Sequence, residues 1–303
     1  MKKVLLTAAA AVVISTSAMA ADLKMPAKAA PPPPPPSPWD IAFGAGIASD
    51  YNFRGVSQSD KKPSVNAYFE PRYNFTPNLQ GYVGIGGYSI DFPNRAAAEI
   101  DLYGGLRPTF GPLAFDFGIW YYWYPGGQEF SAASPQGPLP NGNLAKKDWS
   151  FVEYYGKVAW AVTDAFTVGG NVFYDPNWLN TGADGTYASA TAKYVFTATP
   201  FGYGIGAFVS GEVGRYWLGT TDAFYGTFSL PDYTTWNVGL AFTWNVFTLD
   251  LRYYDTDLSR ADCNALTSDH TASLNPAGVL ESKWCDATFI AKLSFDMTLA
   301  SLK

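Results

Sequence analysis

The sequence has little charge, few cysteines and a single histidine, and it has no long hydrophobic segment beyond its N-terminus. Charged residues make up 15% of the chain, whereas an ordinary soluble protein carries roughly 25%. A helical membrane protein needs runs of about 20 apolar residues, which do not occur after the N-terminal segment. One His and two Cys argue against a metal cluster built from these residues.

Aromatic residues and glycine are abundant instead. The chain is 17% aromatic and 48% hydrophobic and contains 29 Gly, yet its mean hydropathy is only −0.05. This combination is typical of an all-β membrane protein, in which polar residues alternate with apolar ones. The formal net charge of −6 gives no support to nucleic-acid binding, which needs a basic face.

Residues 1–20 have the features of an export signal. Two lysines precede an apolar stretch over residues 4–14, and Ala18 and Ala20 supply the small residues of a cleavage site. The apolar stretch is too short for a membrane-anchoring helix. We therefore predict a secretory signal peptide over residues 1–20 and export through the periplasm.

Residues 21–38 form a proline-rich segment. The run Pro31–Pro36 cannot join the interior of a helix or a sheet and favours a stiff polyproline II rod. We predict a periplasmic linker that acts as a spacer, and contact with the cell wall through the rod and its lysines is the alternative. Residues 39–303 are then expected to form the folded domain.

From Trp39 onward, apolar and polar residues alternate with a period of two, which indicates strands rather than helices. Twelve strands are expected, over residues 39–48, 65–74, 79–92, 98–107, 113–120, 152–160, 166–172, 188–196, 203–213, 236–243, 247–253 and 286–295. The third of these is rich in glycine, and its pattern leaves open which of its faces points inward.

The connections between these strands alternate between long and short. The long ones cover about residues 51–63, 91–97, 125–147, 175–185, 218–232 and 255–283, and each short one spans only a few residues. Outer-membrane barrels sort their connections in this way, with an even strand number, short periplasmic turns and long extracellular loops. We therefore predict an all-β, 12-stranded antiparallel transmembrane β-barrel in the cell outer membrane.

Charge is confined to one face of the predicted strands. A charge that faced lipid at mid-bilayer would cost about 2–4 kcal/mol, so the charged face is expected to point into the lumen. The candidate pore-lining residues are Glu70, Arg72, Glu99, Asp101, Tyr103, Arg107, Asp116, Glu153, Tyr155, Lys157, Lys193, Glu212, Asp250, Arg252 and Lys292. Asp286 falls on the same face, and the excess of acids predicts weak selectivity for cations.

Aromatic residues concentrate at the ends of the predicted strands, as in the two interfacial girdles of a membrane barrel. The residues assigned to these girdles are Trp39, Phe53, Tyr73, Phe75, Phe110, Tyr121, Trp123, Trp160, Phe242, Trp244 and Phe295.

Two features bear on whether the lumen is open. Asp50 and Arg54 flank the first long connection and are expected either to line the pore mouth or to form a salt-bridged rim. The connection over residues 125–147 is rich in glycine and proline; it could fold inward as a constriction, but an exposed, flexible outer loop is favoured. Twelve strands and bulky inward tyrosines allow a narrow open pore or a closed, braced lumen.

Several motifs resemble one family. The segments Ser49–Ser59, Glu99–Gly105 and Phe151–Lys157, together with Cys263 and Trp284-Cys285-Asp286, are similar to the TorF-type porins of Gram-negative bacteria. The resemblance implies an outer-membrane barrel without a firmly assigned substrate. The C-terminus departs from the usual barrel pattern, because Phe295 is followed by eight further residues instead of ending the chain.

Cys263 and Cys285 are expected to form a disulfide, because an even cysteine count in an exported chain implies pairing. The bond would attach the last long connection to the start of the last strand and contribute roughly 3 kcal/mol. His270 lies beside Ser268 and Asp269, but adjacency in sequence does not make a catalytic triad. We therefore predict no enzyme activity, no cofactor and no metal.

These patterns predict a porin-like channel for passive diffusion of small hydrophilic solutes. The alternative is a non-conducting barrel with a structural or surface-interaction role. The expected partners are outer-membrane lipids, lipopolysaccharide and the solutes themselves, with no nucleic acid.

Overall fold

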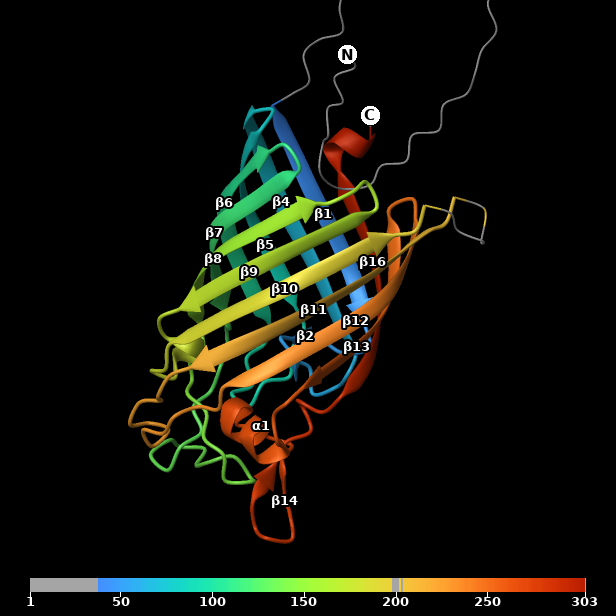
Figure 1. Cartoon of the computed structure of the whole chain (residues 1–303). Helices are drawn as coiled ribbons and strands as arrows, with labels where there is room; N and C mark the ends of the chain where they lie inside the picture. Colours follow the sequence, from blue (N-terminus) through green and yellow to red (C-terminus); the bar gives the residue numbers. More distant parts are fainter. Residues whose placement is uncertain (1–37, 198–201, 203, 303) are drawn as a thin grey trace, which may run out of the picture.

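The computed structural model describes residues 38–197, 202 and 204–302 (Figure 1). The predicted signal peptide and all of the predicted linker except Pro38 lie outside the described residues, as does most of the short connection near residue 200. These domain assignments stay predictions. Among the described residues, no helix is long and apolar enough to cross a membrane.

Twelve antiparallel strands close into one barrel, in the order β1-β16-β13-β12-β11-β10-β9-β8-β7-β6-β5-β4. The predicted fold class and strand number are therefore confirmed. The barrel strands are β1 (Trp39–Ala48), β4 (Ser64–Thr76), β5 (Leu79–Tyr88), β6 (Glu99–Phe110), β7 (Leu113–Trp123), β8 (Phe151–Ala161), β9 (Phe166–Asp175), β10 (Gly185–Val195), β11 (Gly206–Leu218), β12 (Tyr233–Trp244), β13 (Phe247–Thr256) and β16 (Thr288–Thr298).

Six shorter elements lie outside the barrel wall. They are the hairpin strands β2 (Asn52–Phe53) and β3 (Val56–Ser57), the 3-10 helix η1 (Trp178–Asn180), the helix α1 (Arg260–Thr267), and the hairpin strands β14 (Ser273–Leu274) and β15 (Leu280–Glu281). A further 3-10 helix, η2 (Leu299–Leu302), follows the last strand. β16 itself continues to Thr298, three residues past the expected end at Phe295, and η2 follows it.

The two faces of the wall differ as the alternation predicts. Large apolar side chains such as Phe117, Val172 and Leu293 are exposed on the outside, whereas the alternating positions hold charged and tyrosine side chains bonded to one another. The glycine-rich strand β5 now has a defined orientation, because Tyr82 is buried and Val83 is exposed. Its inward glycines leave room for neighbouring rings; a Cβ on Gly84 would overlap the ring of Tyr103.

The two ends of the barrel are built differently (Figure 1). Short turns join the strands at the end where β1 begins and β16 ends. At the other end, the six long connections (49–63, 89–98, 124–150, 176–184, 219–232 and 257–287) share one hydrophobic core, and we call them together the loop cap. Its buried apolar residues include Val56, Phe92, Phe130, Leu139, Trp149, Trp178, Leu230, Leu266 and Trp284.

The loop cap corrects four expectations. The 125–147 connection is not an exposed flexible loop, because Phe130 pairs with Ala145 and both are buried in the cap core. Phe53 belongs to the β2–β3 hairpin and not to an aromatic girdle, and Phe92 lies in the cap because β5 ends at Tyr88. Asp286 precedes β16 and pairs with Arg260. In each case, a non-local contact overrides the local pattern.

Candidate functional site

The first long connection folds back as a hairpin, β2–β3, which we call the inner hairpin (Asn52–Ser57). Its turn consists of Arg54 and Gly55, both with positive φ (49° and 88°), as a two-residue type I′ turn requires. Asn52 accepts a hydrogen bond from the Gly55 N–H through its Oδ1 (2.9 Å). A Cβ at position 55 would overlap Thr256, so the turn is pressed against the barrel wall.

The inner hairpin reaches across the barrel. It follows β1, and β9 lies six strands from β1 in both directions around the ring, which makes β9 the opposite wall. The turn residue Arg54 contacts β8 to β11 on that wall. Figure 1 shows β2 between the walls near the loop cap. The hairpin therefore spans the lumen just inside its long-loop end.

Arg54 and Glu153 form a bidentate ion pair at the tip of the hairpin. The guanidinium donates to both carboxylate oxygens of Glu153, at 2.6 and 3.0 Å. The Glu153 carboxylate also accepts a hydrogen bond from the Tyr122 hydroxyl (3.0 Å). The side chains of Arg54 and Glu153 are only 6% and 1% exposed, so this pair is shielded from water and geometrically specific.

Four aromatic rings surround the Arg54 guanidinium. Their centroids lie at 4.4 Å (Tyr187), 4.5 Å (Phe53), 4.6 Å (Phe173) and 4.9 Å (Tyr216) from its central carbon, within the range of cation–π attraction. Burial alone would lower the pKa of Arg54, but Glu153 and Tyr216 raise it well above the usual value. The guanidinium is therefore charged at every accessible pH.

The base of the inner hairpin is held by the barrel wall and by its own connection. Tyr51 stacks on Tyr88 (centroids 4.6 Å apart) and donates a hydrogen bond to Glu99 (2.5 Å). Burial raises the pKa of Tyr51 well above its usual value. Asp50 accepts hydrogen bonds from the hydroxyls of Ser57 (2.7 Å) and Ser59 (2.9 Å). Burial raises the pKa of Asp50, although these hydroxyls oppose the shift.

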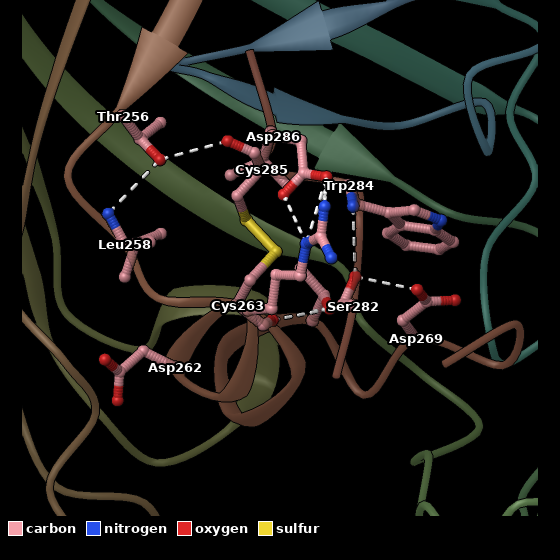
Figure 2. The surroundings of a disulfide bond; sticks show 12 residues. Thr256, Leu258, Asp262, Cys263, Asp269, Ser282, Trp284, Cys285 and Asp286 are labelled. Atoms are coloured by element: carbon pink, nitrogen blue, oxygen red, sulfur yellow. Dashed lines mark hydrogen bonds and ion pairs between the residues drawn. A yellow bond between two sulfur atoms is a disulfide. The ribbon is translucent and has the colours of Figure 1, made fainter. Parts of the chain in front are cut away.

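A disulfide joins Cys263 and Cys285 within the last long connection (Figure 2). Its neighbours hold the connection that carries the hairpin. Ser57 donates its N–H to the carbonyl of Trp284 (3.0 Å), and the Trp284 indole donates to Asp60 (2.8 Å). The disulfide-bonded segment of the last connection therefore supports the first one.

The two residues predicted at the mouth lie close to the long-loop end, but neither lines an open rim. Asp50 is buried and bonded within its own connection, and Arg54 pairs with Glu153 rather than with Asp50. Their role in a pore stays a prediction.

Buried carboxylates surround the inner hairpin. Glu99, Asp101, Glu153 and Asp175 are each at most 2% exposed. Asp175 interacts electrostatically with Glu153 and Arg54. Within the described part of the chain, its Oδ2 has no hydrogen-bond partner. Arg54 therefore brings a guanidinium among these carboxyl groups, and Lys157 of β8 also interacts electrostatically with Glu153 and Arg54.

The short-turn half of the lumen contains a second, wetter network. Arg107 bonds to Glu70 (2.7 Å) and Asp116 (3.2 Å) and lies over the ring of Tyr82 (3.5 Å). Arg72 also pairs with Glu70 (2.6 Å). The side chains of Arg72 and Arg107 are 24% and 29% exposed, in contrast to that of Arg54.

The other predicted lining residues occupy the remaining inner wall. Arg252 forms an ion pair with Asp250 (2.8 Å), and Glu212 accepts a hydrogen bond from the Tyr187 hydroxyl (3.0 Å). The ammonium groups of Lys157 and Lys193 lie over the rings of Tyr155 and Phe208, at 4.5 and 3.9 Å from the ring centroids. Tyr103 stacks on Trp120 (4.2 Å), and Lys292 lies opposite Asp250 across β13–β16.

Two cavities are bounded in part by the inner hairpin, since Asn52 lines both of them. One of about 460 Å³ is bounded by Arg54, Lys157 and Glu212, among others. The other, of about 360 Å³, is bounded by Asp50, Arg252 and Lys292 among others. Both are lined by charged residues from several strands, so the interior of the barrel contains space for water and small polar solutes.

Sequence reasoning missed the aromatic cage around Arg54. Phe173, Tyr187 and Tyr216 lie just beyond the strands expected over residues 166–172, 188–196 and 203–213, so the alternation was not followed as far as these positions. The available signal was the alternation along each strand. Each of these positions is an even number of residues from an inward polar residue on the same strand, namely Asn171, Ser189 or Glu212, and therefore points to the same side of the wall.

His270 does not join a catalytic triad. Asp269 bonds to Thr271 and Ser282, and no hydrogen bond connects it to His270 in the described residues. His270 instead approaches Asp91 (3.4 Å), and with Asp60 these side chains form a group of metal-ligand types. The Lys62 ammonium pairs with both carboxylates, at 2.9 and 2.8 Å, and so supplies the positive charge there.

Comparison with known proteins places the chain in a family. Residues 33–279 match the model of a family described as a bacterial protein of unknown function, Gcw_chp. No curated protein matches the chain significantly. The specific resemblance to TorF-type porins stays a prediction.

Solved structures with similar folds include outer-membrane channels. One is an outer membrane channel from Pseudomonas putida F1 (10% identity, TM-score 0.46), which covers 90% of this chain and 100% of that one. Another is the KdgM porin in complex with oligogalacturonate, with 8% identity and a TM-score of 0.42 over 84% of this chain and 98% of that one. The NanC porin has 10% identity and a TM-score of 0.41, also over 84% of this chain and 98% of that one. At these values, no solute or mechanism can be transferred to this chain.

Proposed function

The chain belongs to the Gcw_chp family of bacterial proteins of unknown function, and we propose that it is an outer-membrane channel for small hydrophilic solutes that the inner hairpin closes at rest. The loop cap faces the outside of the cell, and the short turns face the periplasm. The TorF-type resemblance of its motifs agrees with this role. Solutes cross passively through the lumen lined by the predicted charged and tyrosine residues, without a cofactor or covalent chemistry.

The two faces of the barrel support this location and role. Outward side chains such as Val83 and Phe110 are more than 60% exposed, a state that a lipid environment stabilises and water does not. The inward side chains form polar networks around cavities. A barrel with an apolar outside and a polar, partly hollow inside fits a channel better than a packed structural protein.

The single observation that carries the proposal is the ion pair between Arg54 and Glu153. It joins a hairpin from one wall to the opposite wall, so it closes the lumen while remaining a contact between two separable surfaces. A permanently closed barrel does not need such an element, because wall side chains alone can fill a narrow lumen. Opening then requires displacement of the inner hairpin.

Conductance of the purified protein in planar bilayers tests the proposal. We expect rare, brief openings of the natural protein and long openings after Arg54→Ala, because the hairpin loses its attachment to β8. Arg215→Ala is the matched control: this arginine lies at the rim and approaches Asp257 only to 3.9 Å. If all three proteins insert stably and none carries current, the channel proposal is wrong.

The same measurement distinguishes the channel from a second candidate function, that of a non-conducting structural or surface-interaction barrel. The observation that favours it is the hydrophobic core shared by all six long connections, which makes the loop cap a folded unit over the lumen. Stable insertion without current in the Arg54→Ala protein would support this candidate.

A further inference from the structure

The wall opposite β1 contains most of a cation-binding site even without the inner hairpin. Of the groups around the Arg54 guanidinium, only Phe53 belongs to the hairpin. Phe173, Tyr187 and Tyr216 belong to β9, β10 and β11, and Glu153 belongs to β8. We infer that this wall site binds guanidinium-bearing solutes, and that such solutes open the channel by competing with Arg54. The opening step rests on the proposed function.

The aromatic part of the site is preformed. Tyr187 donates its hydroxyl to Glu212 (3.0 Å) and packs edge-on against Tyr216 (5.6 Å). Gly214 leaves the space that the Tyr187 ring fills, since a Cβ there would overlap it. Tyr216 in turn contacts Trp178 of the loop cap (6.2 Å). These supports come from the wall and from other connections, so the site keeps its shape when the hairpin leaves.

The polar part of the site selects a guanidinium. Glu153 receives two parallel N–H bonds, the geometry that a planar fork satisfies and a compact ammonium does not. Asp175 Oδ2 and the Tyr216 hydroxyl are buried beside it, without hydrogen-bond partners among the described residues. They are free to accept from donors that Arg54 does not supply.

Charge in the region favours entry of a cation once the hairpin has moved. The buried Glu153 carboxylate then remains without the guanidinium that pairs with it in the closed state. Unpaired buried charge is costly, so a free guanidinium stabilises the open arrangement. The site thus links the solute to the state of the hairpin.

Because Arg54 is tethered beside the wall site, its competition sets the apparent affinity of a free solute for that site. Arg54 is joined to its site by a short segment, for which effective concentrations are on the order of millimolar. A free solute therefore binds the natural protein weakly, and removal of Arg54 raises its apparent affinity roughly tenfold or more, because the closed state no longer competes.

The experiment uses L-arginine and its neutral ureido analogue, L-citrulline, as probes. Calorimetry on the detergent-solubilised full chain measures binding, and bilayer conductance measures gating. L-arginine is expected to bind Arg54→Ala at least tenfold more tightly than the natural protein, and to raise the opening frequency of the natural protein. L-citrulline does neither.

Second substitutions in the Arg54→Ala protein assign the binding to the wall site. Glu153→Gln should weaken arginine binding roughly tenfold or more, because a hydrogen bond to a charged group is lost. Asp257→Asn is the matched control; it removes the same charge at the rim and should leave binding unchanged. Circular dichroism verifies that each variant retains its β-sheet.

The outcomes separate the inference from the proposed function. Arginine and citrulline binding alike, or arginine binding that survives Glu153→Gln, would overturn the inference while leaving a conducting Arg54→Ala channel intact. Arginine binding without any conductance in Arg54→Ala would support the wall site but refute the channel and the gating step. Arginine that binds without changing the openings of the natural protein would refute the gating step alone.

Discussion

The two halves of the barrel share one wall but have different interiors. In the long-loop half, Arg54 and Glu153 are almost completely shielded from water beneath a hydrophobic cap. In the short-turn half, Arg72 and Arg107 form comparable ion pairs that remain about a quarter exposed. The strand pattern is the same in both halves. The connections make the difference, because only the long ones bring apolar side chains of their own across the lumen.

The comparison also separates two uses of charge. A partly exposed ion pair contributes little to stability, about 0–1 kcal/mol, so the short-turn network is suited to facing water and solutes. A buried pair is costly to break, about 3–5 kcal/mol when one partner is removed. The Arg54–Glu153 contact is therefore suited to holding a hairpin in place.

The largest expected effect comes from substitution of Trp284 in the loop cap. Trp284→Ala removes a buried side chain that donates to Asp60, and such truncations destabilise by about 3–5 kcal/mol. Trp244→Ala, at the exposed short-turn end, is the control. We expect the first substitution alone to increase limited proteolysis of residues 257–287. Equal proteolysis of both variants would contradict the difference between the halves.

Loss of the disulfide should affect the loop cap and spare the barrel. Replacement of Cys263 and Cys285 by serine removes roughly 3 kcal/mol from the segment that supports the inner hairpin. Chymotrypsin is expected to cleave the cap faster, while the β-sheet circular dichroism spectrum is unchanged. Loss of that spectrum would mean that the cap and the barrel fold as one unit.

The smallest expected effect is a loss of loop-cap stability at low pH through protonation of Asp60. Burial alone would raise the pKa of Asp60, but hydrogen bonds from Lys62, Trp284 and Thr271 outweigh it and lower the pKa. A lowered pKa contributes stability above the unfolded value of about 4, which is lost as the pH falls through the folded pKa. Cap proteolysis by pepsin should therefore rise below about pH 4, and Asp60→Asn should reduce this pH dependence. An unchanged profile in that variant would exclude Asp60 as the cause.

The barrel was predictable from sequence because its signals are local. Alternation along a strand placed charged residues such as Glu99, Lys157 and Arg252 on one face, and the lengths of successive connections indicated the strand number. In membrane barrels generally, an apolar outer face and a polar inner face impose this period on the strands. The glycine-rich strand β5 was the exception, because four glycines removed the side chains that carry the signal.

The loop cap and the Arg54 site were not predictable in this way. Their contacts join residues far apart in sequence, such as Arg54 with Glu153 and Ser57 with Trp284. No period links such pairs, and the 125–147 connection looks like a solvated loop because its apolar residues are scattered. These apolar residues are buried only because the other five long connections pack against them in the loop cap.

The amino-acid sequence by itself determined a barrel of twelve strands, its polar inner face and its one pair of cysteines, since each follows from residue type and spacing along the chain. Only the tertiary structure decided that the first hairpin turns inward and that Arg54 reaches Glu153 on the opposite wall. The physical reason is closure of the barrel: it brings β1 and β9 face to face across a narrow lumen, and no local pattern encodes that distance.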